Sequence, residues 1–174
     1  MPRLFVAIPL PCSFYGLFEP LLLKLSLLDV GKVVLPSELH ITVHFCGEVR
    51  SCDIEELCSK IEKCLVGVKS FPVDLRGVGT FGGRVVWVSA FGSVLSSLFL
   101  KFGSAFFLFD HGGDTVPHVT LCRVKLGSTV SSDFLVKHVS DKFGSFVCDR
   151  VVLYESVLEL TGANHRVIRE FFLC

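Results

Sequence analysis

Two short segments of the chain alternate apolar and polar residues in the same way. The first is Leu39-His40-Ile41-Thr42-Val43 and the second is Pro117-His118-Val119-Thr120-Leu121. Because successive side chains of a β-strand point to opposite faces of a sheet, the histidine and the threonine of each segment share one face. The apolar residues between them pack on the other face. The pattern therefore predicts two matching half-buried strands, over 39–47 and 116–124.

Apolar residues at helical spacing predict four helices. In chain order these cover 13–28, 53–65, 93–102 (ending at Gly103) and 131–142. The second is the most regular, and Asp53-Ile54-Glu55-Glu56 has the pattern of a capping box at its start. Ser13 is a candidate cap for the first helix, and Pro20 is expected to break or kink it. A Ser/Asp cap is expected at Ser131.

Shorter apolar or alternating runs, bounded by Gly and Pro, predict the remaining strands. They cover 3–10, 32–35, 71–81, 84–90, 106–109, 146–160 and 167–173. Gly82-Gly83 indicates a hairpin between two of them, and a loop is expected over 111–114. Each half of the chain thus combines helices and strands with one His-Thr strand. We predict a single α+β domain over 1–174, built from two pseudo-symmetric lobes. Each lobe is an antiparallel β-sheet with helices on the outside, and the two flank a central cleft.

Composition agrees with one compact domain. The chain has 174 residues, of which 51% are hydrophobic and 20% are charged, and its net charge is zero. A neutral chain exerts little long-range attraction on nucleic acid, which argues against a long RNA or DNA partner. Pro9, Pro11 and Glu19 interrupt the apolar N-terminus, and no run reaches the about 18 apolar residues of a membrane span. We expect a cytoplasmic monomer that does not bind membranes.

The eight cysteines form no CxxC pair and match no zinc framework. They are expected to be small buried hydrophobic residues in a reducing compartment. The chain also has 17 Phe against two Tyr. One hypothesis is a uridine-rich coding genome, as in some RNA viruses, and the alternative is drift between similar core residues.

The paired histidines and threonines suggest acid–base chemistry on a phosphate group. Imidazole titrates near neutral pH, so one ring can accept a proton while the other donates one. A threonine hydroxyl can donate a hydrogen bond to a phosphate oxygen. A single His-x-Thr segment is more simply an ordinary strand pair, but its repetition favours a functional site. His44 and Cys46 share the strand face of His40 and raise the alternative of a metal site. We expect neither a metal nor another cofactor, because there is no evident carboxylate cluster.

These segments resemble the 2H phosphoesterases, the superfamily of bacterial RNA 2′,3′-cyclic phosphodiesterases and tRNA-ligase-like proteins. The resemblance covers nearly the whole chain. It rests on the opening strand Arg3–Pro9, the first signature Leu39–Gly47, Phe81 with Arg84–Val88, the second signature Pro117–Leu121 and the late strand Leu153–Leu158. It implies a metal-independent phosphodiesterase in which His40 and His118 are the acid and base, while Thr42 and Thr120 bind the phosphate. Which histidine is the base stays open.

Within this superfamily, size and composition are similar to the 2′,5′-phosphodiesterases of coronaviruses, toroviruses and rotaviruses. Those enzymes degrade 2′,5′-oligoadenylate and so antagonise the RNase L response. The resemblance therefore implies a short 2′,5′-linked oligoadenylate as substrate, in the host cytoplasm. Two alternatives are a 2′,3′-cyclic phosphodiesterase in RNA processing or repair, and a non-catalytic nucleotide-binding module.

Further residues have weaker patterns. Phe81, Trp87 and Tyr15 are candidates for stacking on a base, although core packing explains each of them more simply. Arg84 and Arg123 are expected at the solvated surface rather than on a phosphate, and His165 has no recognisable partner.

Overall fold

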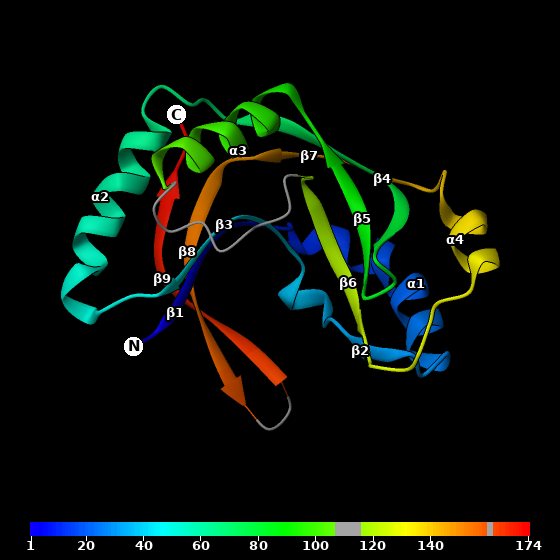
Figure 1. The fold of residues 1–174 in the computed structure, drawn as a ribbon. Helices are drawn as coiled ribbons and strands as arrows, with labels where there is room; N and C mark the ends of the chain where they lie inside the picture. Colours follow the sequence, from blue (N-terminus) through cyan, green and yellow to red (C-terminus); the bar gives the residue numbers. More distant parts are fainter. Residues whose placement is uncertain (107–115, 160–161) are drawn as a thin grey trace.

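The chain folds into one long antiparallel sheet with helices on its outside (Figure 1). The computed structural model describes residues 1–106, 116–159 and 162–174. Its strands are β1 (Arg3–Pro9), β2 (Gly31–Val33), β3 (His40–Glu48), β4 (Phe71–Phe81), β5 (Val85–Phe91), β6 (His118–Val124), β7 (Lys142–Cys148), β8 (Arg150–Glu159) and β9 (Gly162–Phe172). Its α-helices are α1 (Tyr15–Leu27), α2 (Ile54–Leu65), α3 (Ser93–Ala105) and α4 (Ser132–His138), and short 3-10 turns are η1 (Cys12–Phe14), η2 (Pro36–Glu38) and η3 (Ser51–Asp53).

The sheet consists of two halves that meet at the motif strands. Its order is β7-β4-β5-β6-β3-β1-β8-β9, with β2 paired to β6. The halves are joined where β3 meets β6, and Ile41 opposite Val119 is the one residue pair of this ladder in the described residues. Each half therefore contributes one His-Thr strand. The predicted α+β fold is confirmed, and its two lobes share a continuous sheet.

The apolar faces of both motif strands pack into the core. Ile41, Val119 and Leu121 are completely buried and Val43 nearly so. Helix α3 contacts β3 and α1 contacts β6, while α2 packs on α3 and α4 packs on β4. Burial of each such side chain contributes about 1.5–3 kcal/mol. This burial also fixes which face of each strand remains for the polar residues.

The β4–β5 hairpin forms as the Gly82-Gly83 signal predicts. Both glycines have positive φ, 53° and 69°, a conformation that L side chains rarely adopt. Further along the hairpin, Gly79 lies opposite Trp87. A Cβ atom on Gly79 would lie 2.3 Å from Cη2 of the Trp87 indole, so the missing side chain leaves the space that this ring occupies.

The first helix differs from its prediction at its start and at Pro20. Ser13 lies inside η1, and α1 begins at Tyr15 without a side-chain cap. The helix continues through Pro20, which neither breaks nor ends it. Burial of Phe18 and Leu25 on both sides of the proline, at 0% exposure, holds the helix together across the lost hydrogen bond.

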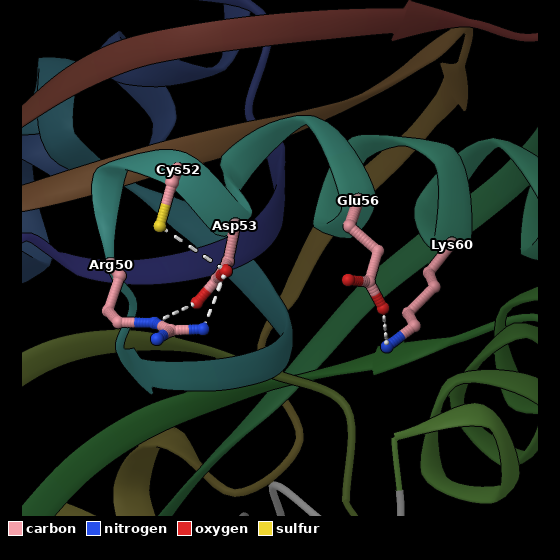
Figure 2. A network of polar contacts seen from close by, with 5 residues as sticks. All are labelled: Arg50, Cys52, Asp53, Glu56 and Lys60. Carbon is pink, nitrogen blue, oxygen red and sulfur yellow. Dashed lines mark hydrogen bonds and ion pairs between the residues drawn. The ribbon is translucent and has the colours of Figure 1, made fainter.

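The predicted capping box of α2 is not formed. The Asp53 carboxylate instead binds the Arg50 guanidinium (Figure 2). Nε lies 2.6 Å from Oδ2, and Nη2 lies 3.0 Å from Oδ1. With both carboxylate oxygens engaged by Arg50, Asp53 makes no side-chain hydrogen bond to a backbone N–H at the start of the helix. The helix itself is confirmed, over Ile54–Leu65.

Other boundaries differ for reasons of packing. Helix α3 passes Gly103 because Phe102 and Phe106, four residues apart, are both buried. Helix α4 has the expected Ser131 cap, which accepts a hydrogen bond from the Phe134 N–H, but it ends at His138. The segment expected as one strand over 146–160 belongs to two strands, β7 and β8, and β9 begins at Gly162 rather than at 167. Residues 107–109 of an expected strand and the loop 111–114 lie outside the described residues.

Five of the eight cysteines are buried as expected, whereas Cys12, Cys52 and Cys174 are exposed. Burial raises the pKa of Cys46 and of Cys148 to about 12, so these thiols stay protonated. No helix in the described part of the chain is both long and apolar enough to span a membrane.

The close contact between Gly79 and Trp87 predicts a specific sensitivity. Gly79→Ala should reduce the free energy of unfolding by about 1–3 kcal/mol, because the added methyl group overlaps the indole ring. Gly16→Ala is the control: it lies in α1 with no atom within 4 Å of the new Cβ, and should leave stability unchanged or raise it by up to about 1 kcal/mol. Urea unfolding measures both. Equal stability of the wild type and Gly79→Ala would contradict the contact.

Candidate active site

The register between β3 and β6 brings the two His-Thr pairs together. Ile41 lies opposite Val119 in an antiparallel pair. One residue to either side, His40 therefore stands across from Thr120 and Thr42 stands across from His118. All four side chains are half-buried, whereas Ile41 and Val119 are completely buried on the other face. The four residues predicted from the sequence thus share one face of the sheet at its centre.

Both histidines are held in the same tautomer. Nδ1 of His40 lies 2.7 Å from the carbonyl oxygen of Glu38, and Nδ1 of His118 lies 2.7 Å from the carbonyl oxygen of Val116. A carbonyl oxygen only accepts, so Nδ1 donates in each ring and carries a proton. Nε2 of each ring is then the nitrogen that can exchange a proton with a substrate.

Two aromatic rings, Phe81 and Trp87, lie beside His118. The Phe81 ring meets the His118 ring edge-on, with 4.9 Å between centroids, and packs against Trp87 at 4.9 Å. Trp87 itself lies 6.3 Å from His118. Two of the three stacking candidates therefore stand beside a motif histidine. Tyr15 packs against the core from the start of α1, and no ring contact among the described residues joins it to His40 or His118.

A different set of rings surrounds His40. Phe5 lies 5.2 Å from it, His165 lies 5.0 Å from it edge-on, and Tyr154 lies 6.4 Å from it. Burial among these rings lowers the pKa of His40 to about 4. The hydrogen bond to the Glu38 carbonyl opposes this shift, and positive charge on His165, Arg123 and His118 adds to it. At neutral pH His40 is uncharged.

Sequence reasoning missed three residues near His40. Arg123 is exposed, as expected, yet it is close enough to lower the pKa of His40. Strict alternation along β6 would place Arg123 on the face opposite His118. A register shift against β5 pairs Thr120 with Trp87 but Cys122 with Val86, so Cys122 turns into the core and Arg123 turns out. The other two residues that the sequence did not indicate near His40 are Glu38, in η2, and His165, in β9.

The alternative metal site gains no support from these positions. His44 stacks on Phe106 at 4.9 Å, and Cys46 is buried with a raised pKa. Within residues 1–106, 116–159 and 162–174, no three His, Cys, Asp or Glu side chains are grouped to hold an ion.

A hollow of about 650 Å³ lies between α2 and α3, away from the motif pairs. Its lining includes Lys60, Lys63 and Lys101 and none of the motif residues. The Lys60 ammonium is 2.8 Å from Glu56, as Figure 2 shows.

Comparison with known proteins identifies relatives over the whole chain. Residues 30–158 match the family described as the 2′-5′ RNA ligase superfamily. An RNA 2′,3′-cyclic phosphodiesterase of Archaeoglobus fulgidus is 32% identical over 97% of this chain and 99% of its own length. A protein of the same name from Methanocaldococcus jannaschii is 29% identical over the same shares of both chains.

Solved structures confirm the fold. The crystal structure of TT0787 from Thermus thermophilus has a TM-score of 0.83 at 23% identity, and covers 98% of this chain and 97% of its own. The MHV ns2 PDE domain has a TM-score of 0.54 at 12% identity, over 97% of this chain and 100% of its own. At that identity the expected likeness to viral enzymes is supported at the level of the fold alone.

The lowered pKa of His40 predicts how stability depends on pH. The unfolded chain binds a proton at this residue near pH 6.5, whereas the folded protein binds it near pH 4. Stability is therefore lost as the pH falls through this window, by up to about 3 kcal/mol at about 1.4 kcal/mol per pKa unit. His40→Gln should lose less stability than the wild type between about pH 7 and pH 4.5 in urea unfolding. An identical loss would contradict the shift.

Proposed function

Because this chain belongs to the 2′-5′ RNA ligase superfamily, we propose that it is a phosphodiesterase that opens a 2′,3′-cyclic phosphate at the end of an RNA. The observation that carries the proposal is the arrangement of His40, Thr42, His118 and Thr120 on two paired strands. Relatives that align over nearly the full chain are named for this reaction.

Hydrolysis of a cyclic phosphate requires two proton transfers. Water attacks phosphorus and loses a proton, while the bond from phosphorus to one ribose oxygen breaks and that oxygen gains a proton. The product is a phosphate monoester beside a free hydroxyl group. With Nδ1 of each ring bonded to a carbonyl oxygen, the imidazole with an unprotonated Nε2 provides the acceptor and the one with a protonated Nε2 provides the donor. The lowered pKa of His40 favours it as the acceptor in the free protein, which leaves His118 as the donor.

The threonines and Arg123 would act on the phosphate itself. Thr42 and Thr120 stand beside the opposite histidine, where each hydroxyl can donate to a non-bridging oxygen as negative charge builds up. Arg123 carries a permanent positive charge close to His40. These donors are in place before the substrate binds, which is what electrostatic stabilisation of a transition state requires.

Phe81 and Trp87 are better explained as support for His118 than as a base platform. Phe81 contacts both the imidazole and the indole, and the indole covers Gly79. We therefore assign base recognition to neither of them.

The same four residues fit the related reactions of 2′,5′-linked RNA. If a 5′-hydroxyl group attacks the cyclic phosphate in place of water, a 2′–5′ linkage forms, and attack by a neighbouring 3′-hydroxyl group reverses that step. The description of the matched family names the linkage. The relatives support the cyclic substrate better than 2′,5′-oligoadenylate, and they give no support to antagonism of RNase L.

A substrate panel tests the reaction. We expect turnover of an RNA with a 2′,3′-cyclic end, measured by chromatography in the presence of EDTA, and slower or no turnover of 2′,5′-linked and 3′,5′-linked oligoadenylates. Turnover of only the 2′,5′-linked substrate would overturn the proposal. Binding of nucleotides without turnover of any substrate would instead indicate a non-catalytic module.

Substitution of the motif residues tests the site. His40→Ala and His118→Ala should each lower kcat at least ~100-fold, the smaller end of acid–base catalysis. Thr42→Val and Thr120→Val keep the shape of the side chain and should lower kcat by about 100-fold with little change in KM. His138→Gln, a histidine of α4 outside the site, is the control and should keep wild-type kcat. Full activity in either His→Ala variant would contradict the assignment.

A further inference from the structure

A third histidine, His165 of β9, lies directly against His40. The two rings meet edge-on, 5.0 Å between centroids and 81° between planes. His165 also meets Phe5 edge-on at 4.9 Å. Strands β1 and β8 lie between β3 and β9 in the sheet order. The His40 and His165 rings therefore meet above the face of the sheet and do not come from paired strands. The proposed reaction does not use His165.

Glu38 is connected to both rings. Its backbone carbonyl accepts the hydrogen bond from Nδ1 of His40, at 2.7 Å. Its carboxylate oxygen Oε2 lies 2.7 Å from Nδ1 of His165. Both side chains of the second contact are largely buried, with 18% of His165 and 22% of Glu38 exposed. One residue of η2 thus holds two imidazoles through two different groups.

The contact between Glu38 and His165 depends on charge. Oε2 is buried and has no hydrogen-bond partner among the described residues, although Nδ1 of His165 lies 2.7 Å from it. A buried carboxylate oxygen without a donor is costly unless a positive charge compensates it. A proton on His165 supplies that charge. Nδ1 of His40 faces the neutral Glu38 carbonyl, which stabilises a protonated ring less than a carboxylate does.

We propose that Glu38 and His165 form a positioning pair for His40. The Glu38 carbonyl orients the His40 ring, and the Glu38 carboxylate causes His165 to be protonated before His40 as the pH falls. A protonated His165 at this separation opposes a second proton on His40. His40, which burial already favours in its neutral form, then stays a neutral acceptor down to a lower pH. The inference rests on the proposed function for its catalytic meaning, although the protonation states can be tested without a substrate.

Among residues 1–106, 116–159 and 162–174, every charged or titratable group that faces His40 enters this balance. Arg123 and His118 of β6 add positive charge and favour the neutral form. Tyr154 of β8 is 6.4 Å away, and burial raises its pKa to about 12, so it stays neutral. Glu38 is the acidic group of the cluster. Burial lowers the pKa of His165 below its usual value, and the charge of Glu38 opposes part of that shift, so removal of that charge is the most direct perturbation.

Imidazole nitrogen NMR on the full chain tests the pair. Long-range ¹⁵N–¹H spectra from about pH 4 to about pH 8 give the protonation state of each histidine. In the wild type, His165 should take up its proton at a higher pH than His40. Glu38→Gln and His165→Gln should each raise the pKa of His40 by about one unit, whereas His165→Lys, which restores a cation, should keep it low. The variants' backbone amide spectra confirm that each is folded.

Asp141→Asn is the matched control. Asp141 and His138 also form a carboxylate–imidazole pair, hydrogen-bonded at 2.6 Å at the end of α4 and away from the site, and loss of the Asp141 charge should leave the pKa of His40 unchanged. The inference is overturned if His40 is protonated before His165, if either Gln variant leaves the pKa of His40 unchanged, or if His165→Lys raises it as much as His165→Gln does.

Kinetics provide a second readout. In both Gln variants the acid limb of kcat/KM should move to higher pH by the same amount as the NMR pKa, with KM little changed. If the wild type fails to open a cyclic phosphate but the NMR shifts occur, the proposed function fails and the positioning pair stands. If the wild type is active and the shifts are absent, the positioning pair fails alone.

Discussion

The site depends on one short contact between two halves of a sheet. Strands β3 and β6 share the single described pair Ile41–Val119. This pair is completely buried, so the residues on either side of it must point away from the core. A slip by one residue in either strand would bury a histidine and expose an isoleucine or a valine, which costs several kcal/mol. The hydrophobic core therefore enforces the register that gathers four polar side chains.

The two histidines are equivalent in backbone geometry but not in environment. Each donates from Nδ1 to the carbonyl two residues earlier. His118 then rests on Phe81 and Trp87, which carry no titratable charge, while His40 rests on Phe5 and His165 with Glu38 behind them. A pair of like groups in unlike surroundings is what a reaction with one proton acceptor and one donor requires.

Much of this could be predicted from local patterns. Alternation around Ile41 and Val119 predicts the faces of both motif strands, and Gly82-Gly83 predicts the hairpin that carries Phe81 and Trp87. These features depend on residues close together in the sequence. The surroundings of His40 do not: His165 is 5.0 Å from it in space but belongs to the last strand, and no periodicity relates the two.

Expectations from the local sequence were wrong where another contact competed for a side chain or where the decisive contact was distant in the sequence. The shift of register near Trp87 reverses the face on which Arg123 lies, and alternation alone cannot signal it. Asp53 has the right position for a helix cap, yet a two-point contact with Arg50 takes its carboxylate. The motifs indicated neither the substrate nor which of the two histidines accepts a proton and which donates one. The proposed substrate rests on what the relatives are named for, and the proposed assignment of acceptor and donor rests on the burial of His40 among specific rings.

The most direct test of the account is to locate a bound phosphate. Titration with nucleoside 2′- and 3′-monophosphates, the two phosphate monoesters that opening of a 2′,3′-cyclic phosphate can leave, can be followed in the imidazole nitrogen and backbone amide spectra. If the phosphate binds between the two motif strands, the signals of His40, His118 and Thr120 will shift together with one dissociation constant. Shifts confined to the hollow between α2 and α3, at Lys63 and Lys101, with both motif histidines unmoved, would contradict it.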